Sequence, residues 1–140
     1  FRPVNIYGPG QRSDFLIPFI IGQVTDPAVP EVTVMDLRPR RDYLYISDFT
    51  DALIRSIGME GFHVFNLGSG QSVSVEEIIT TVMETSGITK PFKASGKERP
   101  NEIWDVFADI RKYSEASGWN PLTPFREGIR HCLSEHPQKT

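Results

Sequence analysis

The chain has 140 residues, of which 39% are hydrophobic and 24% charged, and its formal net charge is −3. This composition is that of one globular domain and excludes a disordered segment, while the negative charge argues against nucleic acid as the main partner. No apolar run is long enough to span a membrane, so no membrane partner is expected, and the single Cys132 excludes an internal disulfide and fits a cytoplasmic protein.

The predicted elements alternate between strands and helices, which indicates the α/β class. Strands are expected over 1–6, 31–35, 43–46, 63–67, 90–94 and 104–108, where short apolar, β-branched or aromatic runs occur. Helices are expected over 15–24, 49–58, 74–86, 109–117 and 123–135. The expected helix caps are Asp14, Ser47 or Asp48, Asp109 and Thr123, together with a capping box of Ser74 and Glu77.

The strand over 1–6 runs into a Gly-Pro-Gly turn at 8–10, and the strand over 63–67 runs into Gly-Ser-Gly at 68–70. Because ligands bind beyond the carboxyl ends of strands in open α/β sheets, these turns are typical of the floor of a site. We expect the two strands to be parallel neighbours in a sheet that continues into further chain. The chain begins at Phe1 rather than Met, so we interpret it as the back part of a longer enzyme.

Four stretches in order carry a family resemblance: RPVNIYGPGQ, RRDYLYISDFTDAL, FNLGSGQSVSVEEI, and ERPNEI followed by ADIRKYSEASGWNP. Together they resemble the C-terminal portion of the NAD-dependent epimerase/dehydratase family, the extended short-chain dehydrogenase/reductases that act on nucleotide sugars. The resemblance implies the last strands of a Rossmann-type parallel sheet plus a small α/β lobe, with residues 1–140 forming the portion that binds the nucleotide sugar. The chain lacks a GxGxxG fingerprint and a Tyr-x-x-x-Lys pair, so the cofactor domain and the catalytic residues are expected to lie elsewhere in the polypeptide.

The resemblance further implies NAD or NADP in the full-length enzyme, a nucleoside-diphosphate sugar as substrate, a role in carbohydrate metabolism, and a homodimer. The chain alone is expected to bind no cofactor and to be inactive. The reaction stays open between epimerisation, dehydration and reduction. The alternative from another class is a stand-alone, non-catalytic module that binds a small molecule or nucleotide.

Arginine suits a diphosphate because its planar guanidinium offers several donors. The resemblance places Arg41 on a phosphate, whereas residue chemistry alone would allow a solvated basic turn. We expect Arg40 to point the other way and Arg38 to belong to that solvated turn. The resemblance also places Arg99 on a phosphate and Glu102 near the ribose, the alternative for Glu102 being an exposed loop.

The resemblance places Asn5 on the substrate diphosphate and the backbone at Ile6 near the nicotinamide amide; an Asx turn is the alternative for Asn5. It places Phe15 and Leu16 over the nucleotide base, with Val34 and Met35 closing the base pocket, although apolar residues are more often core. It gives Ser74 a nucleotide contact, although capping a helix explains this residue equally well. No histidine has a partner at metal-ligand spacing, so no metal is expected.

Overall fold

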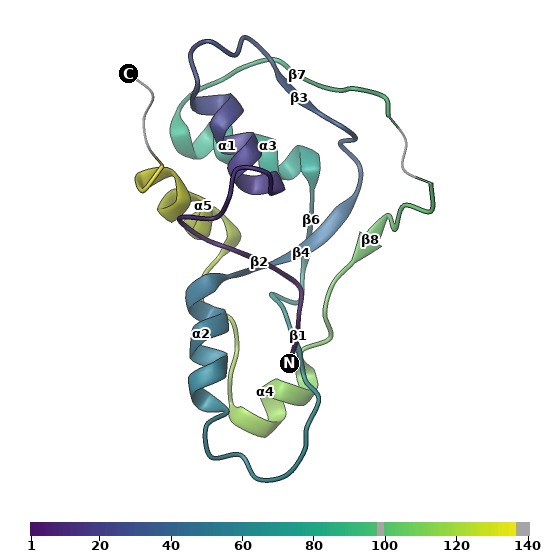
Figure 1. Ribbon diagram of the computed structural model, residues 1–140, viewed down its shortest axis with the longest axis vertical. Helices are drawn as coiled ribbons and strands as arrows, with labels where there is room; N and C mark the ends of the chain where they lie inside the picture. The colour runs from purple at the N-terminus through teal and green to yellow at the C-terminus, as the bar shows by residue number, and fades with distance from the viewer. Residues whose placement is uncertain (98–99, 137–140) are drawn as a thin grey trace.

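The computed structural model describes residues 1–97 and 100–136 of the chain and shows a mixed α/β fold (Figure 1). The strands are β1 (Arg2–Pro3), β2 (Asn5–Tyr7), β3 (Val32–Val34), β4 (Arg40–Tyr45), β5 (Asn66–Leu67), β6 (Ser72–Ser74), β7 (Phe92–Ala94) and β8 (Asp105–Val106). The helices are α1 (Leu16–Thr25), α2 (Ile46–Arg55), α3 (Val75–Ser86), α4 (Arg111–Ser117) and α5 (Phe125–Ser134).

Strand β4 is the centre of the molecule. It pairs in parallel with β2 and β8 and antiparallel with β6, while β3 pairs in parallel with β7. β4 includes Arg40 and Arg41, so this strand begins three residues before the expected strand over 43–46. The backbone pairing with β6 and β8 extends the strand to these two positions.

The expected strand over 1–6 is split into two strands with different partners. β1 pairs in parallel with β5, with Arg2 opposite Asn66, which confirms that the first strand and the strand ending at Leu67 are neighbours. β2 leaves that pair at Val4 and joins β4 instead. β5 is shorter than the predicted strand over 63–67, although Phe65 still accepts a bond from the Arg2 backbone N–H at 2.8 Å.

Two hydrophobic cores lie on either side of β4 (Figure 1). The first, called the three-helix core, lies among α1, α3 and α5, which come together in the upper part of the view. The second, called the two-helix core, lies beside α2 and α4. It consists of Leu44, Ala52, Phe65, Leu67, Tyr113 and Trp119. β4 therefore joins the two halves, and residues on it are held from both sides.

The capping box at the start of α3 is confirmed, because Glu77 N–H donates to Ser74 Oγ at 3.0 Å and Ser74 N–H donates to the Glu77 carboxylate at 2.6 Å. Gly87 follows with φ of 72°, a left-handed conformation that favours glycine. The expected caps of α1, α2 and α5 are wrong, because these helices begin after Phe15, Tyr45 and Pro124 without a side-chain cap bond. Helix α4 begins after Ile110, one residue later than expected, but Asp109 still accepts a bond from the Arg111 backbone N–H at 3.1 Å.

The polar residues expected as caps have other partners. Asp14 pairs with Arg12, and Asp109 pairs with Arg111. Asp48 is buried in the first turn of α2 and accepts a bond from the Thr123 backbone N–H at 3.0 Å. Among the helices in the described ranges, none is long and apolar enough to cross a membrane.

Candidate functional site

The alternation of side chains along β4 and β2 brings two predicted site residues to one face. Arg41 and Tyr43 are two positions apart on β4, and Asn5 on β2 lies opposite Tyr43. Arg40 points to the other face, where its Nη2 donates to the Ser72 carbonyl at 2.8 Å and pairs with Glu77 at 3.0 Å. The expectation that the two arginines diverge is confirmed.

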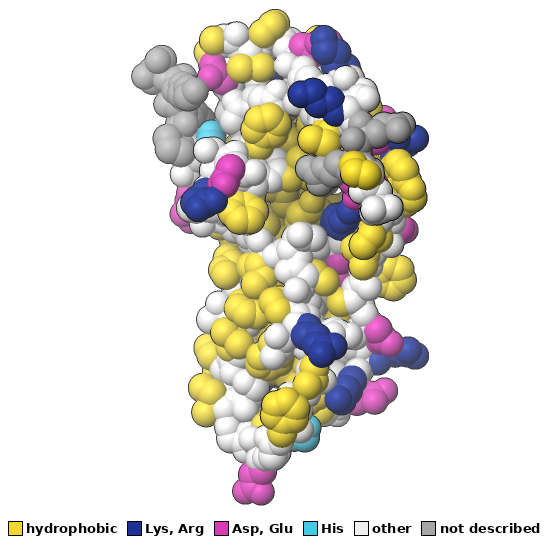
Figure 2. Space-filling view, turned by 45° about the vertical axis from the view of Figure 1, so that its right-hand side comes forward, with side chains coloured by type: hydrophobic (Ala, Val, Ile, Leu, Met, Phe, Trp, Pro, Cys, Tyr) yellow, Lys and Arg dark blue, Asp and Glu magenta, His cyan; other side chains and the backbone are white. Residues whose placement is uncertain are grey.

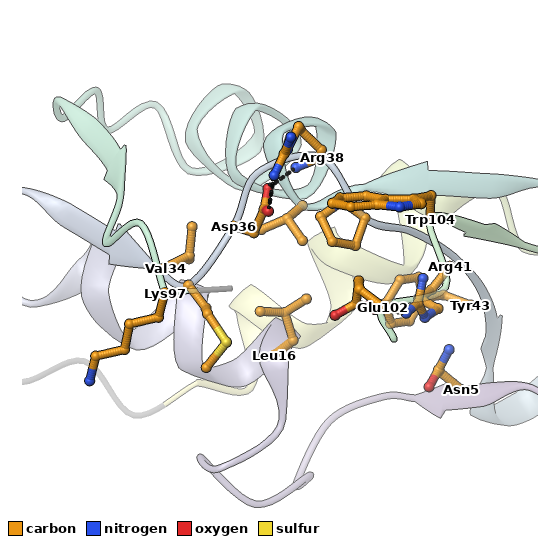
Figure 3. Close-up of a pocket in the computed structure, with 13 residues that line it drawn as sticks. Asn5, Leu16, Val34, Asp36, Arg38, Arg41, Tyr43, Lys97, Glu102 and Trp104 are labelled. Atoms are coloured by element: carbon orange, nitrogen blue, oxygen red, sulfur yellow. Dashed lines mark hydrogen bonds and ion pairs between the residues drawn. The ribbon is translucent and has the colours of Figure 1, made fainter. Parts of the chain in front are cut away.

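A cleft of about 350 Å³ opens on the face that carries Arg41 (Figure 3). Its polar end is formed by Asn5, Arg41, Tyr43 and Glu102. Its apolar end is formed mainly by Leu16 and Val34, with Lys97 beside them in Figure 3, and the apolar Met35 and Val75 also line the cleft. Asp36, Arg38, Pro39 and Trp104 complete the lining. The cleft thus has a cationic, hydrogen-bonding end and an apolar end.

Arg41 is held in place by the segment just before β8. Its Nη1 donates to the Ile103 carbonyl at 2.5 Å and to the Arg40 carbonyl at 2.7 Å, and its Nη2 forms an ion pair with Glu102. The side chains of Arg41 and Glu102 are only 25% and 12% exposed, so this pair is more strongly coupled than one on the open surface. The structure therefore brings together two residues that lie 61 positions apart in the sequence.

Asn5 lines the cleft together with this pair, and Ile6 follows it on β2 opposite Leu44, outside the lining. The Asn5 amide Nδ2 donates to the Asp42 carbonyl on β4 at 3.0 Å, a bond across the sheet and not the Asx turn given as the alternative. The Ile6 carbonyl accepts a bond from Gln11 Nε2 at 3.0 Å, which ties the turn after β2 back onto the strand. The polar end of the cleft thus rests on a braced piece of backbone.

Tyr43 forms a neutral part of this end. Burial raises the pKa of its phenol to about 12, so the hydroxyl keeps its proton at neutral pH. Its ring packs against Tyr7 and Phe125, with centroid distances of 6.1 and 6.0 Å. These rings fix the tyrosine between β4 and α5.

Among the residues predicted at the base, Leu16, Val34 and Met35 line the cleft and Phe15 does not. Phe15 is 49% exposed, and the Arg12 guanidinium lies 5.8 Å from the centre of its ring. Ser74 is also outside the lining, and its side chain serves the capping box. Arg99 lies outside the described residues.

Asp42 is a residue that sequence reasoning missed. It is fully buried, and its carboxylate accepts bonds from Ser69 N–H at 2.8 Å, Ser69 Oγ at 2.7 Å, Gly70 N–H at 3.1 Å and Ala108 N–H at 3.0 Å. A Cβ at Gly68 would lie 2.4 Å from Asp42 Oδ2, so this position needs glycine. The available signal was an aspartate directly before the apolar and aromatic run over 43–46.

Arg38 was assigned to a solvated turn, but it lines the cleft. Its guanidinium lies 4.6 Å from the Trp104 ring centre and pairs with Asp36, holding the pKa of that carboxyl down at about 2. Within residues 1–97 and 100–136, no group of three His, Cys, Asp or Glu side chains is arranged to hold a metal ion.

The family model described as GDP-mannose 4,6 dehydratase matches residues 1–132 of the chain. The chain belongs to this family. It is 28% identical over 138 residues to dTDP-4-dehydro-6-deoxyglucose reductase of Escherichia coli, covering 91% of this chain and 41% of that protein. It is 30% identical over 131 residues to UDP-glucose 4-epimerase of Neisseria gonorrhoeae, covering 86% of this chain and 37% of that protein.

The solved structure of MoeE5 in complex with UDP-glucose and NAD is similar, with a TM-score of 0.84 and 29% identity, over 96% of this chain and 45% of that one. The expected family and the expected fold class, part of a Rossmann-type short-chain dehydrogenase/reductase, are confirmed. The chain spans about two fifths of the length of these curated relatives. Its homologues are NAD(P)-dependent nucleotide-sugar epimerases, dehydratases and reductases.

Proposed function

We propose that this chain is the substrate-binding portion of an NAD(P)-dependent nucleotide-sugar epimerase or dehydratase, and that it binds the nucleoside diphosphate. The observation that carries the proposal is the two-ended cleft, with Arg41, Asn5 and Glu102 at one end and apolar side chains at the other. A nucleoside diphosphate has the same division, because its phosphates are anionic and its base presents flat, weakly polar faces.

Arg41 supplies the phosphate contact. A guanidinium has five N–H donors, and the bonds of Arg41 to described residues use both donors of Nη1 and one of Nη2. The Nε–H and the second Nη2–H can donate to phosphate oxygens while the ion pair with Glu102 keeps the guanidinium in place. Arg99 is proposed to reach the same diphosphate, and Glu102 to accept bonds from the ribose hydroxyls.

The rest of the enzyme is proposed to be an N-terminal Rossmann domain that binds NAD or NADP, in a homodimer located in the cytoplasm. The chain covers only part of the length of its relatives, which supports a longer polypeptide. The backbone at Ile6 is proposed to lie near the nicotinamide of the bound cofactor. The cofactor, when bound, supplies hydride transfer with the sugar. The residues of this chain bind and orient the substrate, and none of them is assigned a catalytic role.

The first experiment replaces Arg41 by Ala in the full-length enzyme. Binding of UDP-, GDP-, dTDP- or CDP-sugars, measured by calorimetry, should weaken by about 1.5–3 kcal/mol, because charge-assisted hydrogen bonds are lost. NAD affinity should hardly change. Arg111→Ala is the control, since this side chain is 82% exposed and lies outside the lining of the cleft. Equal binding by the two variants would contradict the proposal.

The second experiment uses the 140-residue chain alone. We expect no epimerase or dehydrogenase turnover and no micromolar NAD binding, because the sequence lacks a phosphate-cradling loop and a Tyr-Lys pair. Saturable NAD binding in a calorimeter would contradict this expectation and would favour the stand-alone module.

A further inference from the structure

Trp104 is a large aromatic side chain that the fold does not bury. It is 52% exposed and lines the cleft directly before β8. Its backbone is nevertheless fixed, because the Trp104 carbonyl accepts a bond from the Arg40 backbone N–H at 2.8 Å. An aromatic ring on a fixed backbone at the wall of a cleft offers a flat face to a ligand.

One face of this ring is covered by Arg38. The Arg38 guanidinium lies 4.6 Å from the ring centre, within the range of a cation–π interaction. Asp36 holds this guanidinium with two bonds, from Nε at 3.1 Å and from Nη2 at 2.7 Å, and also accepts the Arg38 backbone N–H at 2.9 Å. The Asp36 carboxylate is charged at neutral pH, and its bonds to Arg38 are formed within the chain, so the support is present before any ligand arrives.

The other face of the ring is turned toward the cleft. Figure 3 shows the Trp104 indole edge-on, with Arg38 above it and Glu102, Arg41 and Tyr43 below it. Glu102 and Trp104 are two positions apart, a spacing that places extended side chains on one side of the chain, and both line the cleft. A nucleotide with its phosphates on Arg41 and its ribose beside Glu102 therefore extends its base past Trp104 toward Leu16 and Met35.

We propose that Trp104, backed by Arg38, is the stacking residue for the nucleobase and makes purine nucleoside diphosphates the tighter-binding class. This inference rests on the proposed function, because it takes the diphosphate position from Arg41. A purine has two fused rings and covers more of an indole than the single ring of a pyrimidine. Stacking of a base on an aromatic side chain changes affinity by roughly 5- to 150-fold.

The test compares three probes in the full-length enzyme: GDP, UDP and inorganic pyrophosphate, each titrated by calorimetry. GDP should bind more tightly than UDP. Trp104→Ala should weaken GDP binding by about 10- to 100-fold and UDP binding by less, and leave pyrophosphate binding within about twofold. Arg38→Ala should weaken GDP binding by about two- to fivefold, through loss of the cation–π support.

Phe107→Ala is the matched control. Phe107 is an aromatic residue that is 59% exposed, follows β8 on the same segment and does not line the cleft. It should leave the affinities for all three probes unchanged. GDP should also quench the tryptophan fluorescence of the wild type, and Trp104→Phe should reduce this quenching, because Trp119, the other tryptophan of this chain, is buried.

The outcomes separate this inference from the proposed function. Unchanged GDP affinity in Trp104→Ala, or an equal loss for GDP and pyrophosphate, overturns the stacking role while the diphosphate site stands. GDP binding no tighter than UDP binding overturns the purine preference. If Arg41→Ala leaves all three affinities unchanged, or if none of the probes binds the wild type, the proposed function falls and the inference falls with it.

Discussion

The two cores on either side of β4 are built from different interactions. The three-helix core is mainly aliphatic, with buried isoleucines and valines from α1 and α3 packed on α5. The two-helix core relies on aromatic side chains that also form hydrogen bonds. Tyr113 Oη donates to the Ala52 carbonyl at 2.5 Å, and Trp119 Nε1 donates to the Asp48 carbonyl at 3.2 Å.

The surroundings of the two cores also differ. On and after α2, several large apolar side chains are strongly exposed, including Ile54 at 61%, Ile57 at 81% and Phe62 at 91%. Figure 2 shows hydrophobic side chains spread over much of the lower half of the molecule. On and before α1, beside the three-helix core, large apolar side chains are less exposed, with Phe15 at 49% and Phe19 at 45%, and Leu16 and Val34 of this core line the apolar end of the cleft. This contrast indicates that the site rests on the more self-contained half.

Trp119→Ala should give the largest loss of stability, about 3–5 kcal/mol, because it empties the centre of the two-helix core. Urea denaturation measures the loss. If β4 couples the two cores, one transition shifts as a whole; if the cores unfold independently, only one of two transitions shifts. Trp119→Phe is the control: it keeps one aromatic ring in the core and loses the pyrrole part of the indole with the bond to Asp48, so its cost should be smaller. A loss below about 1 kcal/mol for Trp119→Ala would contradict the role of this core.

Asp42→Ala should cost about 3 kcal/mol, because three backbone N–H groups, of which that of Ala108 is buried, and the Ser69 hydroxyl lose a charged acceptor. Asp42 lies on β4 between Arg41 of the cleft and Leu44 of the two-helix core. This variant therefore tests how much β4, the strand between the two cores, contributes to stability. Asp109→Ala, at an exposed carboxylate, serves as the comparison. Equal unfolding free energies for the two variants would show that the bonds of the Asp42 carboxylate contribute nothing to stability.

Ser74→Ala should cost about 1 kcal/mol, because it removes the cap of α3 in the three-helix core. Thr80→Ala is the control, because Thr80 is an exposed hydroxyl residue in the middle of the same helix. If the two variants lose the same stability in urea, the capping box adds nothing to this core.

The same box predicts a pH dependence. The bond from Ser74 N–H, and to a lesser extent Arg40, lowers the folded-state pKa of Glu77 below its ordinary value of 4.5. A lowered folded pKa gives stability that is fully present above the unfolded pKa and is lost as pH falls through the folded pKa. Glu77→Gln should therefore be less stable than the wild type at pH 7, and the difference should shrink below about pH 4. A constant difference would show that charge is not involved.

Local signals predicted the capping box of Ser74 and Glu77 and the end of this helix at residue 86, since these need only neighbours in the sequence. They failed at Asp48 and Thr123, because a capping residue type does not reveal a partner 75 positions away. At the site, the family resemblance predicted Arg41 and Asn5, and both line the cleft. The wall of Asp36, Arg38 and Trp104 was missed, because a basic turn looks solvated until the chain near residue 104 folds against it.

The smallest effect is expected at the exposed apolar surface beside the two-helix core. In the 140-residue chain, Ile57→Ser should change the unfolding free energy by no more than about 0.5 kcal/mol, since the side chain is 81% exposed. If the proposed Rossmann domain packs on this surface, the same change in the full-length enzyme should cost about 1.5–3 kcal/mol, because a covered isoleucine returns to water. Leu122→Ser, at a residue that is 78% exposed in the loop before α5, is the matched control and should be neutral in both forms. If Ile57→Ser costs equally little in the 140-residue chain and in the full-length enzyme, the surface at Ile57 stays open to solvent in both. The greater apolar exposure beside the two-helix core would then be a property of this chain and not the result of a missing domain.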